Sequence, residues 1–170
     1  MVYTRNTDLT HYETNQRNTN CGSYALRLNE WYSLNERFED EMGIDIENWA
    51  YEEGRNGASD EELTNFYSNV LLKCLLEDFK GELEVCDGAP PMSENIELIA
   101  FNTFCNYDNE SRLFPVDSDF HFKVFRDGVW KEKCGKGVVR ECEEHSWNIY
   151  TGETIYLYHK LETNNEYNNI

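Results

Sequence analysis

The sequence is poor in basic residues. Its 170 residues include 15 lysines and arginines against 33 aspartates and glutamates, which gives a formal net charge of −18 at neutral pH. Proteins that hold nucleic acid without reading its sequence neutralise phosphates with clustered positive charge. The acidic excess argues against such binding by the molecule as a whole, so we expect no nucleic-acid partner.

Long apolar runs are also missing. No stretch approaches the roughly 20 apolar residues that a membrane-spanning helix needs, and the first twenty residues are polar rather than signal-like. We therefore expect no membrane partner and a cytoplasmic location, which would be the host cytoplasm if the protein is viral.

Cysteines are few and widely spaced. The six cysteines, at positions 21, 74, 86, 105, 134 and 142, form no CxxC pair and have no histidine-rich segment beside them. They are too few for a disulfide scaffold, and their spacing is not that of a structural zinc site. We predict no metal and no cofactor, and expect most of the thiols to behave as small buried apolar groups.

The composition suits one folded unit. With 39% hydrophobic and 14% aromatic residues, a chain of this length can bury a core of its own. No internal repeat or linker is evident, so residues 1–170 are predicted to form a single domain. The polar ends, about 1–17 and 162–170, are expected to be flexible because they bury too little apolar surface to offset the entropy of ordering.

The first half of the chain reads as helical. Residues 21–32 place apolar side chains at helical spacing, with Thr19 and Asn20 available as caps, which puts Cys21 at a helix N-terminus.

A clearer helix is predicted over about 60–79, with a capping box formed by Ser59 and Glu62 and an end at Gly81. The acidic segment 35–58 is expected to be a short helix or an ordered loop.

The second half reads as strands. Helices followed by strands predict an α+β fold with an antiparallel sheet. The predicted strands cover residues 82–86, 94–104, 120–125, 129–133 and 154–161.

The strongest local signal is a hairpin around Asp127 and Gly128, since Asp-Gly favours a two-residue type I′ turn. This turn pairs Phe125 with Trp130, Lys123 with Glu132 and His121 with Cys134. Alternation then sends one set of side chains into the core and another to the opposite face. The core set is Phe120, Phe122 and Val124, and the opposite set is His121, Lys123, Phe125, Trp130, Glu132 and Cys134.

The hairpin region differs from the rest in charge. Residues 119–140 contain six basic and three acidic residues. One interpretation is a solvated sheet edge whose lysines oppose aggregation. The other is a cationic patch that stabilises a thiolate or receives an acidic substrate.

Cys21 and His121 meet the requirements of nucleophilic thiol chemistry. Such chemistry needs a thiolate, which the N-terminus of a helix favours, and an imidazole that takes up the proton. The predicted register places Glu132 diagonally from His121, within reach to orient the ring and favour its charged form.

Two segments resemble the NlpC-like branch of the papain-like cysteine peptidases, in particular a set of small bacterial and phage proteins. The first is Asn-Cys-Gly-Ser-Tyr-Ala-Leu at 20–26, and the second runs from Asp119 through His121, Gly128 and Trp130 to Gly135. Their order and separation match the family pattern. The resemblance implies a papain-like α+β fold in which an N-terminal helix carrying the cysteine packs on a C-terminal antiparallel sheet.

The resemblance also implies roles for single residues. Cys21 would be the nucleophile, and His121 the general base and later the acid. The third polar position, a histidine in most relatives, is Glu132 here. A cross-strand ion pair of Glu132 with Lys123 is the main alternative for this carboxylate. Cys134 stands where relatives have a proline. The predicted register places it across from His121, where it would oxidise or simply pack.

The developing oxyanion needs hydrogen-bond donors, which papain-like sites take from the nucleophile's backbone N–H and from a side-chain amide shortly upstream. Gln16, Asn18 and Asn20 are the candidates in this sequence. Tyr24 would line the site or be a half-buried helix tyrosine, and Trp130 is a candidate substrate-binding residue.

Two functions remain open at this point. The first is a cysteine hydrolase, a peptidase or amidase, that cleaves an amide bond of a protein or peptide substrate through a thioester; deamidation and acyl transfer use the same groups. The second is a catalytically silent acidic protein that binds a basic surface of a host or partner protein. A binder keeps its function when Cys21 is replaced by alanine, whereas an enzyme loses it.

Overall fold

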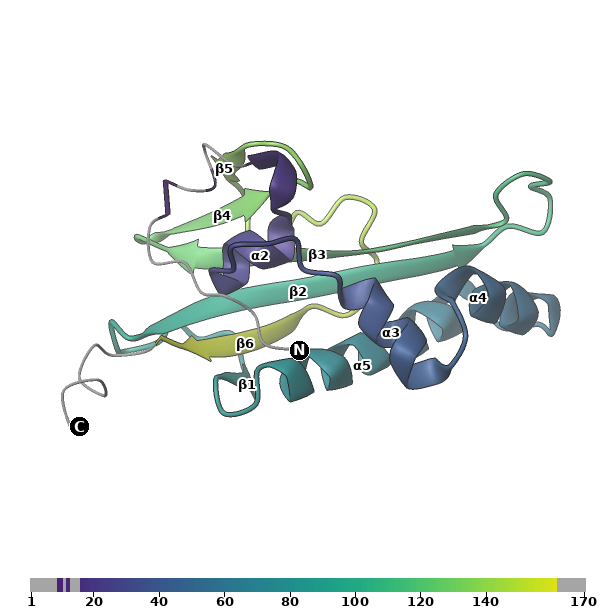
Figure 1. Ribbon diagram of the computed structural model, residues 1–170, viewed down its shortest axis with the longest axis horizontal. Coiled ribbons are helices and arrows are strands. Elements are labelled where there is room, and N and C mark those ends of the chain that lie inside the picture. The colour runs from purple at the N-terminus through teal and green to yellow at the C-terminus, as the bar shows by residue number, and fades with distance from the viewer. Residues whose placement is uncertain (1–8, 11, 13–15, 162–170) are drawn as a thin grey trace.

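The computed structural model describes residues 9–10, 12 and 16–161 (Figure 1). These residues form a short 3-10 helix, four α-helices and a six-stranded antiparallel sheet, which confirms the predicted α+β class. The flexible ends predicted for 1–17 and 162–170 lie largely outside the described residues. Within the described part, no helix has both the length and the apolar character needed to cross a membrane.

The helices come first along the chain. They are η1 (Gln16–Asn18), α2 (Cys21–Leu26), α3 (Leu34–Met42), α4 (Ile46–Arg55) and α5 (Asp60–Asp78). The strands are β1 (Leu83–Cys86), β2 (Ile96–Tyr107), β3 (Val116–Arg126), β4 (Val129–Lys133), β5 (Val139–Glu141) and β6 (Ile155–Lys160). Their order across the sheet is β1-β6-β2-β3-β4-β5.

The core lies between the helices and the sheet. Helix α2 packs on β3 and β4, while α5 packs on β2 and supports α3 (Figure 1). The rings of Tyr32, Phe79, Phe101 and Phe122 are almost fully buried there and contact one another in a chain. The predicted N-terminal helix carrying Cys21 therefore does pack on the sheet.

The predicted hairpin is confirmed. Asp127 and Gly128 have φ angles of 56° and 78°, as a type I′ turn requires. The strand pairs run from Arg126–Val129 to Lys123–Glu132 as predicted. They stop before the predicted His121–Cys134 pair, so β4 leaves this part of the β3 edge uncovered.

The first predicted helix is shorter than expected. It ends at Leu26 rather than at residue 32, because Arg27 adopts a left-handed conformation with φ 58°. Tertiary contacts explain the early end: the Arg27 side chain forms an ion pair with Glu97, 2.9 Å away, and Leu28 turns into the core.

A buried ion cluster fixes α2 against the sheet. The Glu97 carboxylate accepts hydrogen bonds from Arg126, at 2.6 and 2.7 Å, and from Arg27. Arg126 also donates to the carbonyl oxygens of Tyr24 and Ala25 in the last turn of α2. The cluster thus links strand β2, strand β3 and the helix that carries Cys21.

The other elements follow their predictions to different degrees. The helix predicted over 60–79 forms as α5, with the Ser59 side chain accepting from the Glu62 N–H. The segment 35–58, predicted as one short helix or a loop, forms both α3 and α4. Strand β5 was not predicted.

Candidate active site

A cavity of about 390 Å³ opens where the start of α2 meets strands β3 and β4. Cys21, His121 and Glu132 all line it, although they come from three different elements. The segment between β5 and β6 closes one side and contributes Trp147 and Tyr150. The structure therefore brings the three predicted catalytic residues into one pocket.

Cys21 is the first residue of α2. Its side chain is largely buried, and its Sγ lies 4.0 Å from the carbonyl oxygen of Phe120, on the β3 edge that β4 leaves uncovered. Asn20 caps the helix by accepting the Ser23 N–H at 2.9 Å. The Cys21 N–H belongs to the first turn, whose N–H groups have no carbonyl partner within the helix, so it is suited to bind an anion formed beside the thiol.

Glu132 orients His121 from the neighbouring strand. His121 Nε2 lies 3.0 Å from Glu132 Oε1, and both side chains are 8% exposed. The other carboxylate oxygen accepts a hydrogen bond from Arg140 Nε at 3.0 Å. The hydrogen bond to His121 lowers the pKa of Glu132 to about 2, and this outweighs the opposing effect of burial. Glu132 is therefore a carboxylate at any ordinary pH.

Lys123, the alternative partner of Glu132, has other acceptors. Its ammonium donates to the backbone carbonyls of Glu143 and Ser146, at 2.6 and 2.7 Å. It is also 1% exposed, so the view of the hairpin lysines as a solvated edge is wrong at this position.

His121 lies between the thiol and the carboxylate. Burial lowers the pKa of His121, but hydrogen bonds with Cys21 and Glu132 raise it, and the net value is about 9. Since Nε2 faces Glu132, proton exchange with the thiol would use the other ring nitrogen, Nδ1. The arrangement can hold a protonated imidazole beside a thiolate at neutral pH.

Two aromatic side chains hold the imidazole in place. The Tyr150 ring stacks on His121 with a centroid separation of 5.2 Å and an angle of 20°, and Trp147 meets it edge-on. The Tyr150 hydroxyl donates to Asp119 at 3.0 Å. Sequence reasoning missed the roles of Trp147 and Tyr150 because they lie in an irregular segment, and that of Arg140 because β5 is only three residues long.

The side-chain amides predicted to donate to the oxyanion receive little support from the structure. The Asn20 amide donates to the Tyr32 carbonyl at 3.0 Å, so Asn20 serves as a helix cap and a brace. Gln16 begins η1, and its side chain lies outside the described part of the structure.

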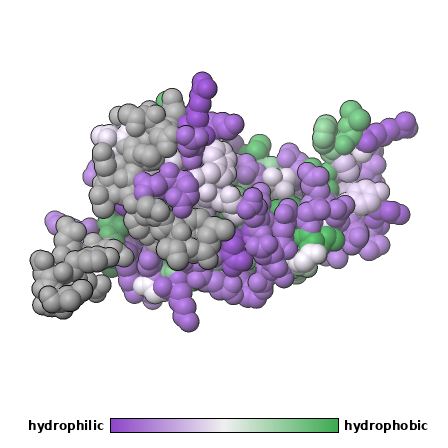
Figure 2. Space-filling view, viewed as in Figure 1, coloured by the Kyte–Doolittle hydropathy of each residue, from purple (hydrophilic) through white to green (hydrophobic). Residues whose placement is uncertain are grey.

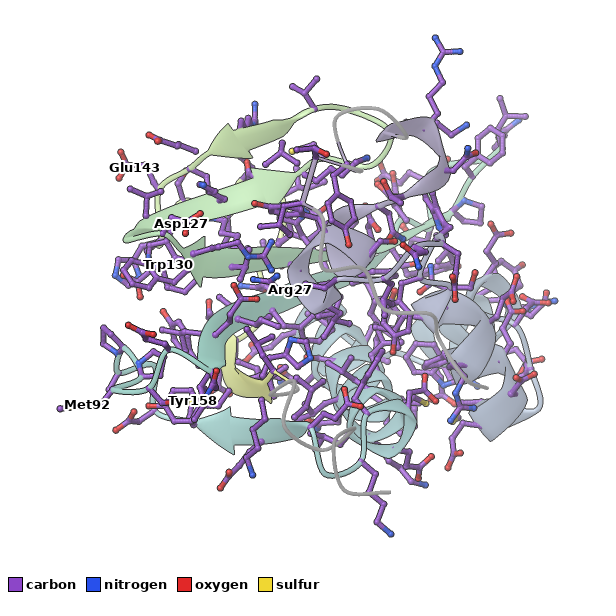
Figure 3. The ribbon with its side chains drawn as sticks, turned by 60° about the vertical axis from the view of Figure 1, so that its left-hand side comes forward. Arg27, Met92, Asp127, Trp130, Glu143 and Tyr158 are labelled. Atoms are coloured by element: carbon purple, nitrogen blue, oxygen red, sulfur yellow. The ribbon has the colours of Figure 1, made fainter. Side chains whose placement is uncertain are left out.

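Tyr24 and Trp130 lie away from the cavity. Tyr24 is buried against the ring of Tyr12 and the guanidinium of Arg126. Trp130 packs beside Phe125, close to the hairpin turn that Asp127 marks in Figure 3. Neither side chain lines the pocket that holds Cys21.

A metal is a second chemical possibility for part of this pocket. Ligand atoms of His121, Glu132 and Cys134 lie within 4.8 Å of one another. The guanidinium of Arg140 already contacts both Glu132 and the Cys134 sulfur, the latter at 3.3 Å. Its positive charge opposes a cation there, so the geometry fits a hydrogen-bond network better than a metal centre.

The paired charges predict how stability depends on pH. The pKa of His121 is raised from 6.5 to about 9, so its contribution is complete below about pH 6.5 and is lost as the pH rises through 9. The pKa of Glu132 is lowered from 4.5 to about 2, so its contribution is lost only in strong acid. The free energy of unfolding, measured with urea at about pH 6 and about pH 10, should fall less in His121→Gln than in the wild type.

His145→Gln provides the control, because the His145 side chain is 82% exposed. This variant should keep the wild-type pH dependence. An equal fall in stability in the wild type and in His121→Gln would contradict the prediction.

Comparisons with known proteins supply no relative. No protein-family model, no curated protein and no solved structure matches this chain.

Proposed function

We propose that the protein is a cysteine hydrolase of the papain-like type. The observation that carries the proposal is the imidazole of His121, held between the Cys21 thiol and the Glu132 carboxylate in one pocket. Nucleophile, base and orienting group in this order are what amide cleavage through a thioester requires. The two sequence segments similar to the NlpC-like branch, as found in small bacterial and phage proteins, contain these three residues.

The groups present account for each proton in the reaction. The Cys21 thiolate attacks the carbonyl carbon of an amide, and the backbone N–H of Cys21 donates to the resulting oxyanion. The intermediate collapses as the His121 imidazolium gives its proton to the leaving nitrogen, which breaks the C–N bond and leaves a thioester. His121 then takes a proton from water, the hydroxide attacks the thioester, and the C–S bond breaks to release the acid and restore the thiolate.

The substrate proposed is an amide or isopeptide bond of a protein or peptide. The same thioester, attacked by an amine in place of water, would give acyl transfer, so the acceptor decides the net reaction.

The proposal is tested with p-nitrophenyl acetate, an activated ester that needs no recognition. Near neutral pH we expect a burst of one equivalent of p-nitrophenolate, an acetyl group on Cys21 detected by peptide mass spectrometry, and slower turnover afterwards. Cys21→Ala should show no burst. The same burst in Cys21→Ala, or acetylation spread over several thiols, would overturn the proposal.

A second candidate function has its own observation. All acidic side chains of α3 and α4, and those in the first turn of α5, are exposed, and the face shown in Figure 2 is largely hydrophilic. An acidic protein that occupies a basic partner would present such a surface. Its effect would persist in Cys21→Ala and weaken with salt, whereas the effect of a hydrolase would disappear in that variant.

A further inference from the structure

Lys133, the last residue of β4, is completely buried. Its ammonium donates to the carbonyl oxygen of Thr19 at 2.6 Å and to that of Gly135. Thr19 lies two residues before Cys21, and Gly135 follows Cys134; Cys21, Cys134 and Gly135 line the same pocket. One ammonium therefore joins the chain entering α2 to the turn after β4.

Lys133 adds a buried positive charge near the three candidate catalytic side chains. With a thiolate at Cys21, the three candidate catalytic side chains carry two negative charges, on Cys21 and Glu132, and one positive charge, on His121. Arg140 also faces Glu132, but its side chain is 58% exposed and its charge is screened by solvent. Lys123 and Lys133 are the buried ammonium groups of the hairpin, and of these two Lys133 has Cys21 among its main electrostatic partners.

Lys133 and the thiol also interact electrostatically. Burial lowers the pKa of Lys133, while negative charge on Cys21 and then on Cys134 acts to raise it. The other titratable groups that interact with Cys21 are His121 on β3, Cys134 just after β4 and Tyr150 between β5 and β6. Of these neighbours, His121 and Lys133 carry positive charge.

Lys123 is a buried lysine of the same hairpin that does not have the Cys21 thiol among its main electrostatic partners. It is equally buried and also donates to backbone carbonyls, but its electrostatic partners are Cys142, Glu132, Cys134 and Glu144 rather than Cys21. It also lies 4.1 Å from the Trp147 ring centroid. Lys123 and Lys133 thus form a matched pair for comparison.

We propose that Lys133 is a positioning residue that holds the start of α2 against β4 and supplies the buried positive charge that keeps Cys21 in its thiolate form. This inference rests on the proposed hydrolase function. A lysine in this role acts on the nucleophile alone and does not touch the substrate.

The test follows the alkylation of Cys21 by iodoacetamide against pH in the wild type, Lys133→Met and Lys123→Met. Lys133→Met should move the pH midpoint of Cys21 alkylation up by about one unit and slow the reaction near pH 6 by about tenfold. Lys123→Met, with a comparable loss of a buried ammonium, should leave the midpoint in place. A wild-type midpoint in Lys133→Met would overturn the inference.

The outcomes separate this inference from the function it rests on. If wild-type Cys21 reacts no faster than the other thiols, the hydrolase proposal fails and the inference falls with it. If wild-type Cys21 is reactive and only the Lys133 effect is missing, the inference alone fails.

If Lys133→Met does not fold, the interaction between Cys21 and Lys133 can be measured from the titration of the Lys133 side chain instead. In Cys21→Ala the Lys133 side chain, followed by NMR, should titrate about one pH unit lower than in the wild type, because the thiolate that favours its charge is gone. An unchanged Lys133 titration would overturn the inference.

Discussion

Replacing His121 with glutamine is expected to slow alkylation of Cys21 near pH 6 by about 100-fold. Glutamine keeps a polar side chain on β3 but cannot hold a proton beside the sulfur. At this pH an ordinary cysteine is less than about 1% thiolate, and only the thiolate reacts. In the wild type the pKa of His121 is about 9, so its imidazolium is present near pH 6 and would favour a thiolate beside it.

The rate would be measured with iodoacetamide and peptide mass spectrometry. Cys86 and Cys142 serve as internal references, because burial raises the pKa of both thiols and they should react slowly in every variant. His145→Gln is the matched histidine variant and should react like the wild type. Cys21 reactivity that is the same with and without His121 would contradict the catalytic account.

Replacing Glu97 with glutamine is expected to lower the free energy of unfolding by about 3–5 kcal/mol. The hydrogen bonds from Arg126 and Arg27 overcome the effect of burial and lower the pKa of Glu97 to about 2. Without the carboxylate, the Arg126 side chain, which is 3% exposed, would keep its charge in the core with no counter-ion. Such an unpaired buried charge is costly.

Urea denaturation near pH 7 measures this loss. The control is Glu84→Gln, since Glu84 is 66% exposed and lies 3.7 Å from Lys160; a surface pair of this kind should change stability by less than about 1 kcal/mol. Because Arg126 holds the last turn of α2, Glu97→Gln should also reduce the reactivity of Cys21. A loss in Glu97→Gln as small as that of the control would show that the cluster does not hold α2 in place.

The hairpin could be predicted because its information is local. Asp127 and Gly128 define the turn, the turn defines the register, and the register places Glu132 near His121, only 11 residues away. The resemblance to a known family then connected this hairpin to Cys21. The prediction that Cys21, His121 and Glu132 lie together needed only the short hairpin segment and the motif around Cys21. The sequence was therefore sufficient to make it.

Other features depend on contacts between distant residues. Helix α2 ends at Leu26 because Arg27 reaches Glu97, seventy residues along the chain. Arg140 meets Glu132 because it is paired with it across β4 and the three-residue strand β5, and Tyr150 lies in an irregular segment. Neither a strand this short nor an irregular segment has a periodicity that the sequence could show.

The hairpin lysines are a further example. Lys123 and Lys133 lie on a charged strand pair, yet both are buried, because carbonyl groups of residues 143–146 and of Thr19 accept their hydrogen bonds. Local sequence describes the donors, but only the tertiary fold provides the acceptors.

The most direct test of the account is an NMR titration of the His121 imidazole in the wild type and in Cys21→Ala, with the resonance assigned by its absence from His121→Gln. The account predicts a wild-type midpoint near pH 9 and a lower midpoint in Cys21→Ala, because the thiolate that favours the imidazolium is gone. A midpoint at or below 6.5 in the wild type, unchanged when Cys21 is removed, would contradict the thiolate–imidazolium pair.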